Sequence, residues 1–336
     1  MKYIVCEKPR KFLLKEKEAP VRKENEALLQ INKVGICGTD LHAYAGNQAY
    51  FEYPKILGHE LASEVIDIGE NDKGIKIGDK VVVIPYISCG VCFACNKGKT
   101  NCCENITVLG VHADGGLQEQ ISVPINLLLP ANHLSDDQIA IVEPLAIGAH
   151  AIRRSGIETD ENVAVVGCGP IGIGIIKLAQ IAGANVIALD MNEQRLNYAK
   201  DKIGADHVVN VGGNALREVT EITNGDLCSI VFDASGNKNA LETCPDYMSN
   251  GGKFVLVGLS KGELTYSHPK VHAKEMTLLC SRNATQEDFE HVMTILDKFP
   301  TSSFITHNVP FIEMIEHFDS WLDPTTGVIK ATVNFK

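Results

Sequence analysis

The sequence predicts an α/β protein of two domains, an antiparallel, partly barrel-like β domain followed by a doubly wound parallel sheet. The first observation is that short β-type runs alternate with Gly- and Pro-rich turns up to about residue 145, as in Ala27–Val34, Glu60–Gly69 and Lys80–Ile87. Such a pattern is typical of antiparallel sheets. The second is that strand-like and helical segments alternate from Asn162 onward, which predicts a parallel sheet with helices on both faces. The length of 336 residues fits two domains of ordinary size.

The second half opens with Val163–Val166, a continuous apolar run of the kind found in strands buried on both faces. The alternation runs to about Cys280, and the strand-like Gly327–Phe335 is expected to rejoin the first domain. The other expected strands are Asn185–Asp190, His207–Asn210, Ser229–Ala234 and Gly252–Leu259, and the expected helices are Ser135–Arg154, Ile171–Ala182 and Asn192–Ile203.

Composition argues against several partners and locations. The formal net charge of −11 argues against a nucleic acid partner, because binding to phosphate backbones needs a basic face. The segment MKYIVCEKPRKF has no apolar stretch long enough for a signal peptide. The most apolar region, 162–189, is broken by glycines, Pro170 and Lys177, so we expect no membrane span. Eleven cysteines without a secretion signal indicate the reducing cytoplasm, where clustered cysteines are more often metal ligands than disulfides.

A glycine-rich loop follows the strand expected at 163–166 and opens the helix expected at 171–182, which is the context that a dinucleotide-binding motif requires. In this motif the first glycine forms the tight turn and the second lets the backbone approach the pyrophosphate at the helix amino terminus. The third allows close packing of helix on strand. The alternative is a glycine-rich turn that binds nothing. The motif residues are Gly167, Cys168, Gly169, Pro170, Ile171 and Gly172.

Asp190 ends the next expected strand. A carboxylate at this place can accept hydrogen bonds from the adenosine ribose and would repel a 2′-phosphate. We therefore expect a Rossmann domain that prefers NAD to NADP. Arg195 lies nearby in the sequence and weakens this preference slightly.

Four cysteines in the pattern C-x2-C-x2-C-x7-C predict a closed, structural zinc site on one loop, because four thiolates complete a tetrahedral zinc sphere. Cys102 competes with Cys103 for the fourth place, and the spacing favours Cys103. The alternatives are reduced surface cysteines and a zinc ribbon that binds nucleic acid. No basic patch accompanies the segment 89–103, which we call the lobe, so a ribbon is not supported. The expected ligands are Cys89, Cys92, Cys95 and Cys103.

A second, looser group of residues could hold a catalytic zinc, which needs about three protein ligands and one open position. Spacing alone leaves this open, since any single His or Cys is more often an ordinary core or surface residue. The group comprises Cys37, His59, Glu60 and Glu143.

Together these motifs resemble the zinc-containing medium-chain dehydrogenase/reductase superfamily, which includes alcohol, sorbitol and threonine dehydrogenases. The resemblance covers essentially the whole chain and rests on CGTDLH at 37–42, GHE at 58–60, the four-cysteine lobe, EPL at 143–145 and GCGPIG at 167–172. It implies a GroES-like catalytic zinc domain over 1–148 and 285–336, and a Rossmann NAD-binding domain over 149–284. It also implies a homodimer or homotetramer with two zinc ions in each chain.

The resemblance assigns metal ligands by position. Cys37 and His59 match ligands of the catalytic zinc. In the sorbitol and threonine branches, residues matching Glu60 and Glu143 complete the sphere, one of them directly and the other directly or through water. Alcohol dehydrogenases use a cysteine as the third ligand, and this chain has no cysteine near 143, so it departs from that branch.

The resemblance also assigns residues around the metal. The family's proton relay falls on Thr39 and His42. Asp40 matches a carboxylate that orients the histidine ligand. Lys330 matches a basic residue that contacts the cofactor phosphates.

Four segments narrow the resemblance to sugar-acid dehydrogenases of the L-galactonate and L-gulonate 5-dehydrogenase type: GNQAYFEYPKILGHE at 46–60, IPYISCGVCFACNKGKTNCCE at 84–104, GVHADGG at 110–116 and SRNATQEDF at 281–289.

A sugar acid needs a cation for its carboxylate. Arg282 is the candidate, because it follows the last expected strand of the nucleotide-binding domain, and polyol dehydrogenases of the family place an arginine there. Its planar guanidinium suits a carboxylate. His112 and Asn47 are candidates for substrate hydroxyls. For each of the three, the alternative is an ordinary surface or loop residue.

Three other functions are weighed against this one. The same chemistry could act on a neutral polyol such as sorbitol, or on threonine. A zinc-free quinone reductase of the same superfamily is disfavoured by Cys37, His59 and the four-cysteine lobe. A non-catalytic zinc- and nucleotide-binding protein is disfavoured by the Thr39 and His42 relay, which binding alone does not need.

Overall fold

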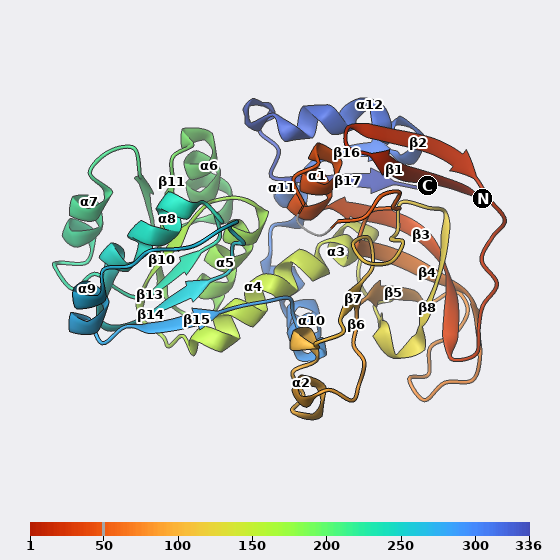
Figure 1. The fold of residues 1–336 in the computed structure, drawn as a ribbon, viewed down its shortest axis with the longest axis horizontal. Helices are drawn as coiled ribbons and strands as arrows, with labels where there is room; N and C mark the ends of the chain where they lie inside the picture. Colours follow the sequence, from red (N-terminus) through yellow and green to blue (C-terminus); the bar gives the residue numbers. More distant parts are fainter. Residues whose placement is uncertain (49–50) are drawn as a thin grey trace. The chain divides into compact units, whose positions relative to one another are not determined.

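The structure is a computed structural model that describes residues 1–48 and 51–336. Ala49 and Tyr50, which belong to the segment 46–60 that carries part of the resemblance, lie outside the described residues. The described chain divides into two compact units (Figure 1). The first comprises Met1–Glu143, Thr285–Asp297 and Thr301–Lys336, and the second comprises Pro144–Ala284 and Lys298–Pro300.

The largest sheet of the first unit contains β3 (Glu26–Ile36), β4 (Glu60–Ile68), β5 (Lys80–Val83), β8 (Gln120–Pro124), β9 (Leu128–Pro130), β16 (Ile305–Pro310) and β17 (Lys330–Asn334). Its order is β16-β17-β3-β4-β5-β9, with β8 also paired to β3. Every pairing is antiparallel except that of β16 with β17. The sheet is antiparallel because its strands alternate along the chain with turns rather than with crossover helices.

The rest of the first unit consists of two ribbons and short helices. The ribbons pair β1 (Lys2–Lys8) with β2 (Lys11–Glu16), and β6 (Tyr86–Ile87) with β7 (Thr107–Val108). The helices are α1 (Gly38–Ala45), α2 (Phe93–Asn96), α3 (Asp136–Ala140), α10 (Gln286–Ile295), α11 (Thr301–Phe304) and α12 (Met314–Phe318).

The second unit holds a wholly parallel sheet of six strands: β10 (Asn162–Val166), β11 (Asn185–Asp190), β12 (His207–Asn210), β13 (Cys228–Asp233), β14 (Met248–Leu256) and β15 (Thr277–Cys280). The order is β12-β11-β10-β13-β14-β15, so the chain moves outward on one side of β10 and then outward on the other. This confirms the doubly wound sheet. The helices of this half are α4 (Val142–Ser155), α5 (Pro170–Ile181), α6 (Glu193–Tyr198), α7 (Ala215–Ile222), α8 (Lys238–Thr243) and α9 (His268–Ala273).

Three predicted elements are interrupted in the structure. The run Lys80–Ile87 becomes β5 and β6, because Pro85 between them has no N–H to donate to a ladder. The predicted helix Ser135–Arg154 becomes α3 and α4, and the hydroxyl of Ser135 caps α3 by accepting a hydrogen bond from the backbone of Gln138. The predicted helix Asn192–Ile203 changes from α6 into a π-helical turn at Ala199.

The carboxyl-terminal strand β17 lies in the sheet of the first unit. It pairs antiparallel with β3, with Val333 opposite Val34. The chain therefore returns to its first sheet after completing the parallel one, and Lys330 reaches the neighbourhood of residues far from it in sequence. Among the helices of the described ranges, none has the length and apolar character needed to cross a membrane.

Candidate active site and zinc centres

The first centre is built around the amino terminus of α1. Cys37 precedes this helix, and its backbone N–H donates to Oδ2 of Asp40 over 2.9 Å. The other oxygen, Oδ1, accepts from the backbone of Gly58 over 3.1 Å. Asp40, which is 1% exposed, therefore ties the CGTD turn to the turn that carries His59.

His59 is buried with one ring nitrogen unpartnered. Its Nδ1 makes no hydrogen bond and lies 3.8 Å from Oδ1 of Asp40, which is longer than a hydrogen bond but close enough for charge interaction. Burial alone lowers the pKa of His59, but the negative charges of Asp40 and Cys37 outweigh it and raise that pKa well above its ordinary value. The anionic groups that enclose this imidazole make the site electrostatically favourable for binding a cation.

Glu60 lies beside His59 with its carboxylate fully enclosed. A Cβ at Gly35, its partner across β3 and β4, would lie 2.0 Å from Oε2 of Glu60, so only glycine leaves room for the carboxylate. Both oxygens of Glu60 accept from Nζ of Lys330, over 2.6 and 2.8 Å, and this ammonium also donates to the backbone oxygen of Ile36 over 3.1 Å. Glu60 raises the pKa of Lys330 although burial acts to lower it, so the ammonium stays charged.

Glu143 lies in the first turn of α4 and is 5% exposed. Its Oε1 accepts a hydrogen bond from the buried hydroxyl of Tyr86. Burial and the neighbouring carboxylate hold the pKa of Tyr86 well above its usual range, so the phenol keeps the proton that it donates. Glu143 is outside the tightest group of the centre, which is formed by the Sγ, ring nitrogen and carboxylate oxygen of Cys37, His59 and Glu60, all within 4.8 Å of one another.

These residues fit a zinc ion. The donors are a thiol, an imidazole and carboxylates, which are the groups that bind zinc in proteins. Lys330 supplies one positive charge against the carboxylates of Glu60, Glu143 and Asp40, so a divalent cation would offset the remaining negative charge. One buried nitrogen of His59 has no hydrogen-bond partner, so the hydrogen bonds within the centre do not satisfy all of its polar groups.

The other residues predicted near this centre lie on or beside α1 and in one loop. Thr39 and His42 are on α1, with Thr39 half-buried and His42 exposed. Residues with this separation share a helix face. Asn47 is exposed, and its backbone donates to the oxygen of His42 over 2.8 Å. His112 is exposed and uses its Nδ1 to accept from the backbone of Val108 over 3.0 Å, so that nitrogen supports its own loop.

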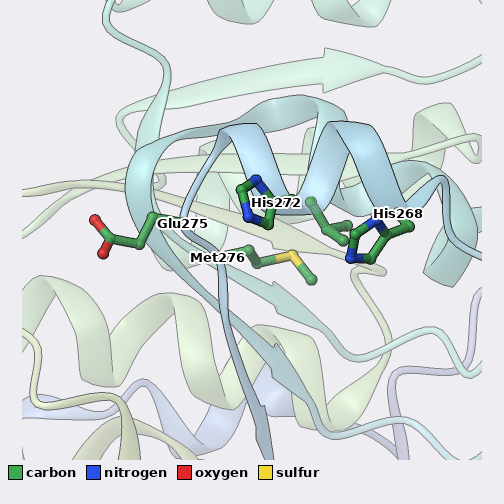
Figure 2. Close-up of a pocket in the computed structure, with 5 residues that line it drawn as sticks. His268, His272, Glu275 and Met276 are labelled. Carbon is green, nitrogen blue, oxygen red and sulfur yellow. The ribbon is translucent and has the colours of Figure 1, made fainter.

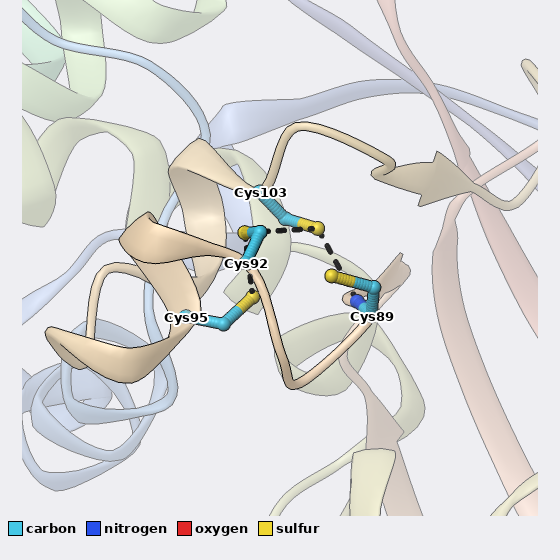
Figure 3. A group of neighbouring side chains, drawn as sticks. All are labelled: Cys89, Cys92, Cys95 and Cys103. Atoms are coloured by element: carbon cyan, nitrogen blue, oxygen red, sulfur yellow. Dashed lines mark hydrogen bonds between the residues drawn. The ribbon is translucent and has the colours of Figure 1, made fainter.

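The second centre is the lobe that follows β6, and Figure 3 shows its four sulfurs facing one another. The Sγ atoms of Cys92 and Cys95 are 3.4 Å apart, and those of Cys92 and Cys103 are 4.0 Å apart. Four sulfurs around one tetrahedral zinc would be about 3.8 Å apart. Cys103 belongs to this group, whereas Cys102 is exposed outside it. The lobe therefore has the geometry of a closed, four-thiolate site.

Backbone groups prepare the lobe for anionic sulfur. The N–H groups of Cys89 and Asn105 donate to Sγ of Cys103 over 3.2 and 3.4 Å. Hydrogen bonds from backbone N–H groups, first of all that of Val91, lower the pKa of Cys89 to about 6. Loss of hydration raises that of Cys95 to about 11. Four thiols this close cannot all ionise without a cation, and zinc is the cation that such a donor set selects.

The glycine loop joins β10 to α5. A Cβ at Gly172 would lie 1.7 Å from the backbone oxygen of Gly167, so the third glycine permits the close packing of helix on turn. Gly167 has a φ of +98°, which favours glycine. Gly169 is the N-cap residue of α5. A Cβ at this position would have only Nη1 of Arg195 within 4 Å, at 4.0 Å, so the space beside the Cα is open. Pro170 occupies the first turn and Ile171 is half-buried beside it.

Asp190 ends β11 at the edge of this loop. Its Oδ2 accepts from the backbone of Cys168 over 2.7 Å, and its Oδ1 accepts from the backbone of Asn192 over 2.9 Å. The carboxylate therefore stabilises the glycine loop through backbone hydrogen bonds. It also lies at the position where we predict a contact with the ribose. Arg195 lies on α6, after the turn that Asn192 caps.

Arg282 is exposed and follows β15 in the second unit. The same unit has a surface hollow of about 540 Å³ lined by residues of α9 and the turn after it (Figure 2). The rings of His268 and His272 face this hollow beside Met276, with their centroids 5.6 Å apart. The described residues that line the hollow include none of the predicted site residues.

Comparison with known proteins decides the family. The family model described as "Alcohol dehydrogenase GroES-like domain" matches residues 23–133, and the model described as "Zinc-binding dehydrogenase" matches residues 170–298. The L-galactonate-5-dehydrogenase of Escherichia coli K12 is 40% identical over 337 residues, covering 100% of this chain and 99% of the relative. The chain belongs to the zinc-binding alcohol dehydrogenase family. It is an oxidoreductase that acts on the CH–OH group of a small molecule, which confirms the predicted enzyme class.

Two solved structures share the whole architecture of this zinc-binding dehydrogenase. A protein described as a short chain alcohol dehydrogenase from Escherichia coli CFT073, complexed with NADH, is 29% identical with a TM-score of 0.92 and covers 100% of this chain and 99% of its own. L-idonate 5-dehydrogenase of Escherichia coli K-12 is 25% identical, also with a TM-score of 0.92, and covers 99% and 98%. These matches confirm the GroES-like and Rossmann folds.

Sequence reasoning missed two features of the dehydrogenase's site. Tyr86 stands in no metal-ligand or cofactor pattern, and only the folded structure brings its hydroxyl to Glu143. Lys330 was expected near cofactor phosphates, and the structure places its ammonium on Glu60, with the side chain 1% exposed. A contact between Lys330 and a cofactor phosphate stays a prediction. The signal in the sequence that could have suggested a buried carboxylate partner is a lysine within the strand-like run Gly327–Phe335.

Proposed function

We propose that this zinc-binding dehydrogenase uses NAD to oxidise a secondary hydroxyl of a sugar acid, in the manner of an L-galactonate 5-dehydrogenase. The observation that carries the proposal is the full-length match at 40% identity to an enzyme of that name. The buried Cys37, His59 and Glu60 group supports a metal-dependent chemistry at an alcohol carbon. The match to L-idonate 5-dehydrogenase supports a sugar acid rather than a neutral polyol.

We propose that each chain binds two zinc ions. Cys37, His59 and at least one of Glu60 and Glu143 would hold the catalytic ion, and the four cysteines of the lobe would hold a structural one. The bound catalytic zinc would supply a Lewis acid that polarises the substrate hydroxyl. Asp40 would orient His59 through its nearby carboxylate. Lys330 would neutralise Glu60, so that Cys37, Glu143 and Asp40 remain as the anionic groups around the divalent ion.

The protein's own residues would move the proton that leaves the hydroxyl. Thr39 and His42 share a face of α1, and a hydroxyl followed by an imidazole forms a path toward solvent, because His42 is exposed. Cys37 directly precedes α1, so the same helix positions a metal ligand and the relay. Asn47 and His112 remain candidates for contacts with substrate hydroxyls.

NAD would bind at the glycine loop of the second unit and accept the hydride. The open side of Gly169 at the start of α5 supports the approach of a pyrophosphate. Asp190 supports the choice of NAD over NADP, because its carboxylate lies at the end of β11. Arg282 would bind the substrate carboxylate.

We also propose a homodimer or homotetramer. In support, β15 is an edge strand of the parallel sheet, and Leu278 within it is 45% exposed. Edge strands with exposed apolar side chains are suited to pairing with another chain. Light scattering would measure the mass, and a monomer at micromolar concentration would contradict the proposal.

The substrate is tested by an NAD-reduction screen over aldonic acids, polyols and L-threonine with the zinc-loaded enzyme. We expect the highest kcat/KM with L-galactonate or L-gulonate. A preference for sorbitol or threonine would replace the sugar acid with one of the alternative substrates. Turnover of none of these alcohols, with both zinc ions bound, would contradict the proposed substrate class.

A further inference from the structure

The hydroxyl of Tyr86 is the one polar group of β6 that reaches the catalytic centre. Tyr86 is 7% exposed, and its ring packs edge-on against the fully buried Phe289 of α10, with centroids 6.2 Å apart and planes at 74°. The pairing of β6 with β7 sets Tyr86 opposite Val108. Backbone pairing and ring packing therefore fix the direction of the phenol, and it donates its proton to Oε1 of Glu143.

The two buried glutamates of the centre have different partners. Lys330 engages both oxygens of Glu60 with a positive charge. Tyr86 has one O–H to donate, so it can engage one oxygen of Glu143 only. A phenol adds no positive charge, and so it holds the carboxylate without repelling a cation nearby. Glu60 thus has a charged partner on both oxygens, whereas Glu143 is oriented through one oxygen by a neutral donor.

We propose that Tyr86 is a positioning residue for the catalytic metal, and that it fixes Glu143 with one oxygen engaged and the other directed to the zinc. The inference rests on the proposed function in one respect, since it requires a zinc at Cys37 and His59. It explains why a tyrosine is buried at the start of β6, where a phenylalanine would pack equally well against Phe289 but would leave a buried carboxylate oxygen without its donor.

The test is Tyr86→Phe in the full-length, zinc-loaded protein. Residues that orient metal ligands typically change metal affinity by about 10- to 100-fold, so zinc affinity at the catalytic site should fall by that factor in chelator competition. The lobe zinc in the same molecule should keep its affinity and serves as an internal reference. With cobalt in the catalytic site, the d–d absorption should shift, because the position of the Glu143 ligand changes.

Tyr44→Phe is the matched control. Tyr44 lies in the same unit, is 5% exposed, and donates to Oδ2 of Asp319 over 3.1 Å, so this variant also removes a phenol–carboxylate hydrogen bond. It should leave both zinc affinities and the cobalt spectrum unchanged. A merely structural role for Tyr86 would lower the melting temperature of the metal-free protein in both variants and leave zinc affinity intact in both.

A double variant separates direct action from action through Glu143. If Tyr86 acts through Glu143, adding Tyr86→Phe to Glu143→Ala should change zinc affinity little further. Additive losses would overturn the proposal, as would an unchanged affinity and cobalt spectrum in Tyr86→Phe. If the unmodified protein held only the lobe zinc, the metal centre of the proposed function would itself be wrong and this inference with it. A normal second zinc with no effect of Tyr86→Phe would overturn the inference alone.

Discussion

The two candidate zinc centres of the first unit are assembled in opposite ways. The lobe takes all four sulfurs from residues 89–103, on one loop with a short helix. The other centre takes Cys37 from the start of α1 and His59 and Glu60 from the start of β4, with Glu143 on α4 and Lys330 on β17 around them. The lobe can form wherever its loop is intact, whereas the second centre exists only after the sheet has folded. A local site therefore depends on spacing, and a dispersed site depends on the whole fold.

The groups that support the ligands differ as well. In the lobe they are backbone N–H groups, which any residue provides. In the dispersed centre they are the side chains of Asp40, Lys330 and Tyr86, each buried and each specific. Substitutions should therefore separate the two centres: changes in the lobe should act on stability, and changes in the dispersed centre should act on turnover.

The largest effect is expected from His59→Ala. Lewis-acid catalysis supplies several kcal/mol, and each 1.36 kcal/mol is tenfold in rate, so kcat/KM should fall at least about 10³-fold. Metal analysis should show the loss of one zinc per chain while the lobe zinc remains. An active His59→Ala enzyme, or one that had lost the lobe zinc instead, would break the assignment of the two centres.

Thr39→Val tests whether the dispersed centre includes the relay on α1. A well-placed proton-transfer group contributes on the order of 10² to 10⁴ in rate, so kcat should fall by that factor while the zinc content stays at two per chain. His42→Ala should cost less, because water can replace an exposed imidazole, and its rate should recover at higher pH. Steady-state kinetics and metal analysis together measure this. A normal kcat in Thr39→Val would contradict the assignment of Thr39 to the proton relay.

Much of the fold was predictable because the periodicity of the chain is regular. The strands Asn185–Asp190 and His207–Asn210 have the predicted bounds, since each is an apolar run between turn signals. The edge strand β15 was expected only as a last strand before Arg282, without bounds, because its residues are exposed and no buried apolar run marks it. β16 was not predicted, and it alternates polar and apolar residues in a segment without flanking glycines.

The site was predictable to the extent that its residues lie in short motifs. The spacing of the cysteines favoured Cys103 over Cys102, and the structure places Cys103 in the cluster. Lys330 and Tyr86 have partners that are remote in sequence, Glu60 and Glu143, and no local pattern reports such a pair. The room that Gly35 leaves for Glu60 is likewise visible only across two paired strands.

Cys92→Ser tests the lobe as a structural site. Losing a cross-link across a loop as short as 89–103 should lower the free energy of unfolding by about 3 kcal/mol, since metal binding to the folded state adds to folding free energy. At 2–4 °C per kcal/mol for a domain of 150–250 residues, the melting temperature should fall by about 6–12 °C. One zinc should be lost, and kcat at low temperature should change little. Thermal unfolding gives the melting temperature and metal analysis gives the zinc content. An unchanged melting temperature would contradict a stabilising role for the lobe zinc.

Arg282→Ala examines a residue outside both zinc centres, which was assigned by its place after the last expected strand of the parallel sheet and by resemblance. Removing one partner of a desolvated charge pair costs about 2–5 kcal/mol, so kcat/KM for L-galactonate or L-gulonate should fall by roughly thirty-fold or more. Lysine should restore only part, because it keeps the charge without the planar fork. Activity toward sorbitol should fall much less. An equal loss on acid and polyol would mean that Arg282 supports the fold or the cofactor instead.

The smallest effect is expected at Asp190, which combines a local and a dispersed role. Its carboxylate holds the backbone of Cys168 and Asn192, and it is also the predicted ribose partner. Asp190→Ala should therefore narrow the preference for NAD over NADP by about 10- to 100-fold, since a hydrogen bond to a charged group contributes about 1.5–3 kcal/mol. Asp190→Asn is the informative companion, because it keeps an oxygen acceptor for the loop and removes only the charge. If repulsion of the 2′-phosphate dominates, the two variants should accept NADP equally well, as measured by kcat/KM for each cofactor. If loop support dominates, Asp190→Ala should lose affinity for both nucleotides while Asp190→Asn stays close to the unmodified enzyme. Comparable kcat/KM for NAD and NADP before any substitution would contradict the predicted preference for NAD.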